Sequence, residues 1–376
     1  MKYGIILIII CLFIFPAQAK YSGGTGEPND PYLIATTEDL MLLGNSPEDY
    51  DKHFILTADI DLDPNLPGGQ VFDRAIVAPD TDADTRDFRG SGFTGSFDGS
   101  GYKIRNLTID TEGADNEYLG LFGRIDETGE VKDLNIENVI IVGGEDSGIA
   151  GGLAGWNSGT IIASHSTGSI TCGYAAVGGL VGWNKGAITV SDSNSNVTGQ
   201  FWLGGLVGLN LSTGIITDSY ATGVVSASQE PNGDFVGLGI DIGGLVGSNA
   251  GKITNCFAAG GVSGNQRIGG LVGSNELGEI ISCYSISSVA GTFFIGGLVG
   301  YNWAIIRDCY STSDVEGNKN VGGLVGINEG EVIHCYSTGS VMGNDTVGGL
   351  SGFNKQVVFQ SFWDIETSGQ TASAGG

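Results

Sequence analysis

The sequence predicts an all-β fold, a right-handed parallel β-helix (β-solenoid) of about eight to ten coils behind an N-terminal cap. Three observations support this fold class. A heptapeptide, Gly-Gly-Leu-Val-Gly-x-Asn, recurs through the chain, and its copies follow one another at a nearly fixed spacing. Each unit between two copies holds three short apolar pieces separated by turns that contain Gly or Asn. A fixed period of roughly 20–50 residues is typical of solenoids, in which each unit rests on the one before it.

The heptapeptide occurs in six close copies, with near-copies at 151–157 and 348–354. The steps between successive copies are 27, 26, 39, 26, 27, 26 and 26 residues. The long step reads as one unit plus an insertion within 227–242, where Pro231 and Asn232-Gly233 indicate a surface loop. Such a loop is a natural place for specificity, and a neutral insertion is the alternative.

Composition narrows the class of protein. The chain has 376 residues, 66 of them glycine, with 41% hydrophobic residues and a net charge of −26. A G-X-Y period is missing, so the glycine content does not indicate collagen, and the apolar content is too high for a disordered chain. An acidic surface of this kind repels nucleic acid, so we expect no nucleic-acid partner.

Residues 1–19 are typical of a secretory signal peptide. Lys2 precedes an apolar run from Ile5 to Phe15, and Ala17-Gln18-Ala19 provides a small-residue cleavage site. The run is shorter than the roughly 20 residues that span a bilayer, although a retained membrane anchor is the alternative. We therefore expect a secreted or cell-surface protein with no transmembrane segment after cleavage.

Residues 20–117 are expected to form an N-terminal cap and irregular first coils. Thr36 or Thr37 before Glu38-Asp39 predicts a helix cap and a short helix over 38–44 that covers the open end of the stack. Strands are expected at 53–56, 59–62, 93–97 and 102–109, with a turn at 96–101 because of its Gly and Asp content.

Residues 118–363 are expected to form the repeat solenoid. Pieces of four to six residues have the usual length of strands, and the Gly-Gly pairs and β-branched residues disfavour helix. Three strands in about 26 residues would make one triangular coil, with successive coils separated by about 4.8 Å. Residues 364–376 are expected to be a tail that is cut off before a further segment.

Stacking in register would place equivalent residues of successive coils on top of one another. The last residue of the heptapeptide forms one such row, which we interpret as structural because stacked amides can bond one another and the turn backbone. The row is Asn157, Asn184, Asn210, Asn249, Asn275, Asn302, Asn328 and Asn354.

A second row holds only small residues and is expected to lie inside. It runs Ser164, Ser191, Ser219, Cys256, Cys283, Cys309, Cys335 and Ser361. Disulfides are an option in a secreted protein. Side chains in such a row would point in parallel, however, and five cysteines remain once Cys11 is removed with the signal. Buried thiols acting as small hydrophobic groups are therefore the favoured interpretation.

The next residue in each unit should face outward, and in most units it is aromatic. The row contains Tyr220, Phe257, Tyr284, Tyr310 and Tyr336 after His165 and Asp192, and it ends at Phe362. An exposed strip of rings would suit sugar rings or a partner surface. The alternative is that the rings only cover the adjacent sheet.

Motifs of known chemistry are missing, with one weak exception. The three histidines do not form HExxH, and neither a P-loop nor a nucleophile elbow is present. The run Asp80, Asp82, Asp84 and Asp87 resembles the opening of a calcium loop, but Thr85 and Ser91 occupy positions where an EF-hand has Gly and Glu. The run is a candidate Ca²⁺ site, with a solvated acidic loop as the alternative; no other cofactor is indicated.

The repeats resemble the GLUG motif, named for Gly-Leu-x-Gly, here Gly179-Leu180-Val181-Gly182 and its counterparts. The stretches 58–62, 93–109 and 118–123 also resemble the segment that precedes such repeats. The resemblance implies a secreted or surface-attached bacterial protein, adhesin-like and β-helical. Some relatives are parts of immunoglobulin-cleaving peptidases, but the metallopeptidase motif is missing here, so that activity is not expected.

Two functions follow as hypotheses. The favoured one is a non-catalytic, structural or adhesive solenoid that presents its faces to a glycan, matrix or surface-protein partner. The alternative is a carbohydrate-active enzyme, a lyase or glycoside hydrolase, which should show convergent carboxylates and a basic group on one face. Ice binding ranks last, because Asn194, Ala259 and Ile286 interrupt the threonine row that it needs.

Overall fold

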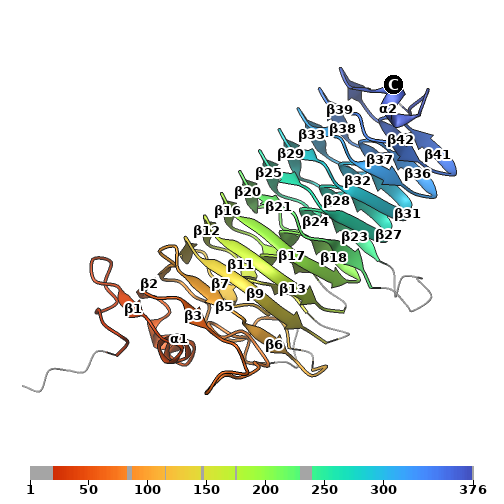
Figure 1. Ribbon diagram of the computed structural model, residues 1–376. Helices are drawn as coiled ribbons and strands as arrows, with labels where there is room; N and C mark the ends of the chain where they lie inside the picture. Colours follow the sequence, from red (N-terminus) through yellow and green to blue (C-terminus); the bar gives the residue numbers. More distant parts are fainter. Residues whose placement is uncertain are drawn as a thin grey trace, which may run out of the picture.

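A computed structural model describes residues 20–82, 87–114, 116–144, 148–173, 176–228 and 239–374. The predicted signal peptide lies outside these residues, as does most of the predicted loop 227–242. The described chain forms an elongated stack of parallel strands, with α1 at the N-terminal end and α2 at the C-terminal end (Figure 1). The predicted β-solenoid is confirmed.

Three parallel sheets run the length of the stack. Sheet 1 has 12 strands: β1 (Tyr32–Ile34), β2 (His53–Leu56), β4 (Ser96–Asp98), β8 (Glu130–Lys132), β12 (Thr160–Ile162), β16 (Ala187–Thr189), β20 (Ile215–Thr217), β25 (Lys252–Thr254), β29 (Glu279–Ile281), β33 (Ile305–Arg307), β38 (Glu331–Ile333) and β43 (Val358–Phe359). Sheet 3 has 9 strands: β7 (Phe122–Ile125), β11 (Ala154–Asn157), β15 (Val181–Asn184), β19 (Val207–Asn210), β24 (Val246–Asn249), β28 (Val272–Asn275), β32 (Val299–Asn302), β37 (Val325–Asn328) and β42 (Ser351–Asn354).

Among the described residues sheet 2 has 23 strands, because most coils contribute two or three pieces to it. They are β3 (Ile60–Asp61), β5 (Lys103–Arg105), β6 (Thr108–Asp110), β9 (Asn135–Val142), β10 (Ala150–Gly151), β13 (His165–Thr171), β14 (Val177–Gly178), β17 (Asp192–Gly199), β18 (Phe201–Gly204), β21 (Tyr220–Ala221), β22 (Val225–Ala227), β23 (Ile240–Gly243), β26 (Phe257–Ala258), β27 (Gly261–Gly269), β30 (Tyr284–Ser285), β31 (Ser288–Gly296), β34 (Tyr310–Ser311), β35 (Asp314–Glu316), β36 (Lys319–Gly322), β39 (Tyr336–Ser337), β40 (Val341–Met342), β41 (Asp345–Gly348) and β44 (Phe362–Trp363).

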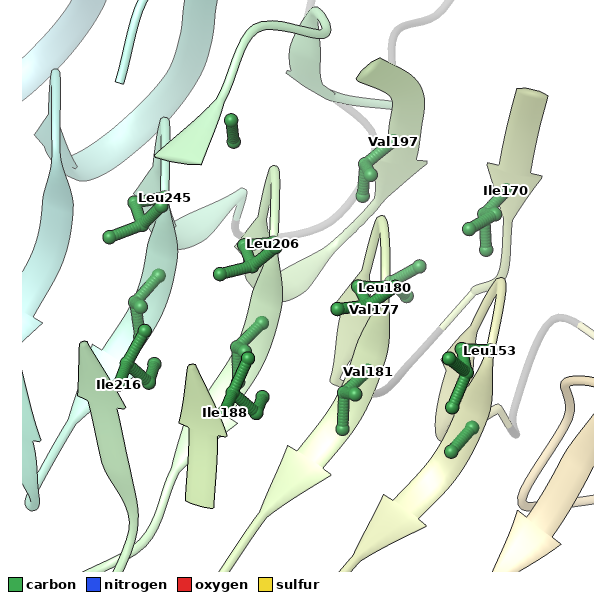
Figure 2. Packing of buried hydrophobic residues seen from close by; sticks show 14 of the residues in the cluster. Leu153, Ile170, Val177, Leu180, Val181, Ile188, Val197, Leu206, Ile216 and Leu245 are labelled. Carbon is green, nitrogen blue, oxygen red and sulfur yellow. The ribbon is translucent and has the colours of Figure 1, made fainter. Parts of the chain in front are cut away.

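Equivalent residues pair between successive coils. Val181 pairs with Val207 and Val207 with Val246, and the partners on sheet 1 keep the same register. The heptapeptide leucines and the flanking valines and isoleucines are fully buried. Figure 2 shows Leu153, Leu180, Leu206 and Leu245 in a row through the interior. Each coil therefore contributes the same apolar set to one continuous core.

Glycine in the heptapeptide allows a close approach between backbones. A Cβ atom at Gly270 would lie 2.1 Å from the carbonyl oxygen of Gly297 in the next coil. A Cβ atom at Gly273 would lie 2.4 Å from the backbone nitrogen of Ile242, on the strand that packs against β28. These contacts leave no room for a side chain, which explains why the repeat keeps its glycines.

The N-terminal cap follows the predicted chemistry with small differences. Helix α1 spans Thr37–Gly44, and Thr36 and Asp39 form a reciprocal capping box. The predicted turn at 96–101 was partly wrong, because Ser96–Asp98 forms β4. Its neighbours β2 and β8 pair with it on both sides, and Phe97 is buried, so tertiary pairing overrides the turn-forming residues.

The predicted tail packs against the last coil. Helix α2 spans Ile365–Ser368, and Gln370 then donates a hydrogen bond to the carbonyl oxygen of Val341 (2.9 Å). Ser373 accepts hydrogen bonds from the backbone N–H groups of Leu350 and Ser351. Residues 364–374 thus cover part of that coil.

Candidate binding surfaces

The asparagine row forms a continuous amide ladder inside the solenoid. Each Nδ2 donates to the Oδ1 of the next asparagine at 2.7–2.9 Å, from Asn157 to Asn354. Most of these asparagines also bond the turn that follows, as Asn249 does with the carbonyl oxygen and the N–H group of Gly251. The side chains are fully buried from Asn157 to Asn328, so they are occupied with one another and offer nothing to a ligand.

The cysteines lie inside as free thiols. Cys256, Cys283, Cys309 and Cys335 are fully buried, and each Sγ lies 3.0–3.1 Å from a carbonyl oxygen two residues earlier. Burial raises the pKa of the Cys309 thiol above its usual range, and burial raises the pKa of the fifth thiol, Cys172, to about 12. All four thiols of the row are shielded from solvent and act as small apolar groups, so the row serves packing.

The aromatic row forms a ladder of stacked rings on sheet 2. Centroids of consecutive rings from Tyr220 to Tyr336 are 4.8–5.0 Å apart, with interplanar angles of 2–6°. Phe362 continues the stack at 5.8 Å. We call the set Tyr220, Phe257, Tyr284, Tyr310, Tyr336 and Phe362 the ring ladder.

The ring ladder presents rims rather than faces to solvent. Each inner ring has a neighbouring ring against both faces, and the inner side chains are half-buried. The outer face of Phe362, which is 63% exposed, is open at the C-terminal end. A sugar ring stacks on an aromatic face, so the row can offer mainly hydroxyl groups along its length. Ligand binding by the ladder stays a prediction.

A polar cluster continues the ladder towards the N-terminus. His165 Nδ1 lies 2.5 Å from Asp192 Oδ2, and Lys103 pairs with Glu137 at 2.7 Å. The hydrogen bond to Asp192 raises the pKa of His165, and desolvation opposes it. Burial raises the pKa of the Tyr220 hydroxyl, and Asp192 adds to the rise. The set Lys103, Glu137, His165 and Asp192, called the polar cluster, brings carboxylates and basic groups together on one outer face.

The acidic run is only partly described. Asp84 lies outside the described residues, so the predicted four-carboxylate set has no complete geometry. Asp80 Oδ1 accepts hydrogen bonds from the backbone N–H groups of Asp82 and Arg89, which closes the loop. Among the described residues, no three His, Cys, Asp or Glu side chains gather in a way that would hold a metal ion. Calcium binding at Asp80, Asp82 and Asp87 stays a prediction.

Sequence reasoning missed one row at a corner of the coils, in which neighbouring coils carry unlike residues. Each member adopts a left-handed backbone at the corner just before the heptapeptide. The row is Trp202, Asp241, Arg267, Phe294, Asn320 and Thr346. The asparagine row and the row of buried Ser and Cys repeat one kind of residue, whereas this corner row places chemically distinct groups at coil spacing. The sequence signal that could have revealed this row is the variation of the residue two positions before the heptapeptide, which itself hardly changes.

An ion pair lies in the middle of the corner row. Arg267 Nε is 2.8 Å from Asp241 Oδ1, although the two atoms are not aligned as a hydrogen bond. The Asp241 side chain is 4% exposed and that of Arg267 is 25% exposed. Burial raises the pKa of Asp241 to about 7, with a smaller contribution from Glu276, while Arg267 opposes the shift. The carboxylate is therefore buried beside an arginine side chain that is partly exposed.

Aromatic side chains flank this ion pair on its C-terminal side. Phe294 meets Tyr301 edge-to-face at 5.9 Å, and Tyr301 stacks on Trp303 at 3.7 Å and 19°. Trp303 is 38% exposed. Burial and a hydrogen bond to Glu329 raise the pKa of Tyr301 to about 12. We call Arg267, Phe294, Tyr301 and Trp303 the aromatic patch.

A second aromatic group near the N-terminus is filled by its own side chains. Tyr118 stacks on Trp156 at 5.7 Å, and the Arg124 guanidinium lies over the Trp156 ring at 4.7 Å. Trp183 packs against both Tyr118 and Trp156. These contacts leave less free ring surface than at Trp303.

Comparison with known proteins matches the GLUG motif at residues 203–226, 294–316 and 317–342, which confirms the predicted motif. Halomucin of Haloquadratum walsbyi is 36% identical over 152 residues, which cover 39% of this chain and 2% of halomucin. A candidate Gly-rich membrane protein of Evansella cellulosilytica is 35% identical over 162 residues, which cover 42% of this chain and 17% of that protein. The chain thus spans a small part of the relatives it matches.

A similar structure is known for a candidate immunoglobulin A1 protease of Bacteroides ovatus. The TM-score is 0.50 at 16% identity, over 92% of this chain and 87% of that one. At this identity the likeness supports the fold alone. No helix among the described residues has the length and apolar character needed to cross a membrane.

Proposed function

We propose that this chain, a parallel β-solenoid carrying GLUG repeats, is a non-catalytic adhesive protein of the cell surface that binds glycan through its aromatic patch. A stack of coils in register makes a stiff support, which suits a protein that holds partners at a distance. The membrane-protein description of one relative and the predicted signal peptide at 1–19 support the location.

The exposed ring of Trp303 carries this proposal. Its inner face is stabilised by Tyr301, so the indole is held ready for a ligand, and its 38% exposure leaves ring surface accessible. Arg267 and the Glu329–Lys355 pair, at 2.5 Å, provide polar groups beside it. An apolar ring bordered by hydrogen-bonding groups matches a sugar, which has an apolar face and a rim of hydroxyls.

The test is a glycan array probed with the purified chain and two variants. Trp303→Ala removes the exposed ring, and we expect it to abolish binding. The control replaces Tyr284, Tyr310 and Tyr336 together by Phe, which keeps the ladder stacked and removes its hydroxyls; we expect binding to survive. Loss of binding only in the ladder variant would move the site to the ring ladder. A wild-type chain that binds no glycan would end the proposal.

The polar cluster favours a second candidate function, a carbohydrate-active enzyme. His165, with its raised pKa, and Lys103 could neutralise or protonate a sugar group, while Asp192 and Glu137 supply carboxylates on the same face. Incubation with neutral and acidic polysaccharides, followed by detection of new reducing ends, tests this role. Products formed by the wild type and lost in both His165→Ala and Asp192→Asn would establish the enzyme and refute the non-catalytic proposal.

A further inference from the structure

Arg267 is positioned to recognise a negatively charged group. Its backbone lies in the left-handed region, with φ of 57°, and its Nε lies 2.8 Å from Oδ1 of the buried Asp241 in an ion pair. No hydrogen bond joins its terminal nitrogens to any described residue, and the side chain reaches the surface. With Nε turned towards Asp241, the two terminal nitrogens form a planar fork, which fits a carboxylate through two parallel hydrogen bonds.

Two of the carboxylates around Arg267 are already engaged. Asp241 is covered by Arg267 itself, and Glu329 is held by Lys355 at 2.5 Å and by the Tyr301 hydroxyl. Glu276, which acts on the Asp241 carboxylate, is the remaining nearby acid. The Arg267 fork is thus the local cation available to a ligand, and Tyr301 with Trp303 provides ring surface on the C-terminal side.

We infer that the aromatic patch selects a carboxylated sugar of the uronic-acid type, with its carboxylate on Arg267 and a sugar ring on Trp303. This inference rests on the proposed function, and it adds the substrate class and the residue that determines it. The alternation of a cation and an apolar ring over neighbouring coils fits an extended acidic oligosaccharide. A protein partner would call for a contiguous apolar patch instead.

The test uses an array on which each carboxylated oligosaccharide is printed beside its methyl ester and a sulfated counterpart. Esterification keeps the sugar ring and removes the charge. We expect the wild-type chain to prefer the free acid by roughly tenfold or more, as for a charge-assisted bidentate contact. Arg267→Gln should bind acid and ester equally, and Arg267→Lys should keep part of the preference.

Two controls separate recognition from folding. Arg307→Gln removes an exposed arginine on sheet 1 and should keep the full preference. Arg267→Gln leaves the Asp241 carboxylate buried without its cation, which lowers stability. The double variant Asp241→Asn/Arg267→Gln removes this buried charge as well, and circular dichroism checks that both variants fold.

The outcomes distinguish the two proposals. Equal binding of acid and ester by the wild type, stronger binding of the sulfated partner, or a preference retained in the double variant would overturn the inference and leave glycan binding standing. Binding to no printed glycan would overturn the proposed function, and the inference with it.

Discussion

Replacing Asn275 by alanine removes one step from the middle of the amide ladder. Asn275 donates to Asn302 Oδ1 (2.8 Å) and accepts from Asn249 Nδ2 (2.9 Å), and all three side chains are fully buried. The two groups that lose Asn275 each keep one bond: Asn249 Nδ2 still donates to the Gly251 carbonyl, and Asn302 Oδ1 still accepts from the Ala304 N–H. A half-satisfied buried amide costs about 1–1.5 kcal/mol, so we expect a loss of about 2–3 kcal/mol in unfolding free energy.

Asn354 offers a matched control at the end of the ladder. Asn354→Ala also removes a bond, from Asn328 at 2.7 Å, but Asn354 is only partly buried and water can replace its amide. We expect a cost below about 1 kcal/mol. Guanidinium unfolding gives the overall change, and amide hydrogen exchange reports the opening of the affected coil, since a repeat stack need not unfold in one step. If Asn275→Ala and Asn354→Ala lower the unfolding free energy by amounts that agree within about 0.5 kcal/mol, the buried amide ladder does not stabilise the stack as described.

Three further predictions concern packing and charge. Gly270→Ala places a Cβ atom 2.1 Å from a carbonyl oxygen, so it should prevent folding or lower the unfolding free energy by several kcal/mol. In Gly261→Ala the nearest contact of the new Cβ atom is 3.7 Å, so this variant should be neutral or slightly stabilised. Thermal unfolding compares the two. Tyr310→Ala removes two stacking contacts and should cost about 1–3 kcal/mol in chemical unfolding, while Tyr310→Phe should be nearly neutral; equal losses would count against stacking. The pKa of His165 is raised in the folded chain. The stabilisation from protonated His165 is therefore complete below the unfolded pKa and is lost as pH rises through the folded pKa. Asp192→Asn should remove this dependence of unfolding free energy on pH, and an unchanged pH profile of stability would contradict the assignment.

Much of the fold follows from the repeat itself. The spacing of the heptapeptide predicts the stack of coils. Where successive repeats carry the same residue at an equivalent position, these side chains are predicted to lie next to one another. Cys283 lies inside and Asn275 bonds its counterparts in the neighbouring coils, as the uniform rows of small and of amide-bearing residues predict. The strand at Ser96–Asp98 was predicted only in part, since a strand was expected over 93–97 and a turn over 96–101; its partners on both sides show that it is paired.

The candidate site was harder to predict for a physical reason. Repetition identifies residues that hold the coils together, whereas a ligand needs groups that differ from coil to coil. Arg267 and Trp303 stand at positions where the repeat varies, so a search for rows passes over them. Likewise, the sequence places Tyr310 on the outside but does not indicate that its neighbours cover both faces of its ring.

The spacing of coils is the quantity on which every surface described above depends. Nitroxide labels on cysteines introduced at Thr167 and Thr338 would measure it by pulsed electron resonance, since the described native thiols are buried. Backbone pairing relates these positions through Asn194, Thr222, Ala259, Ile286 and Thr312. Six steps of about 4.8 Å predict a narrow distribution centred near about 29 Å, apart from the length of the labels. A broad distribution would contradict stacking in register, and so would a distance that does not shorten by about one strand spacing, ~4.8 Å, when the second label is moved from Thr338 to Thr312.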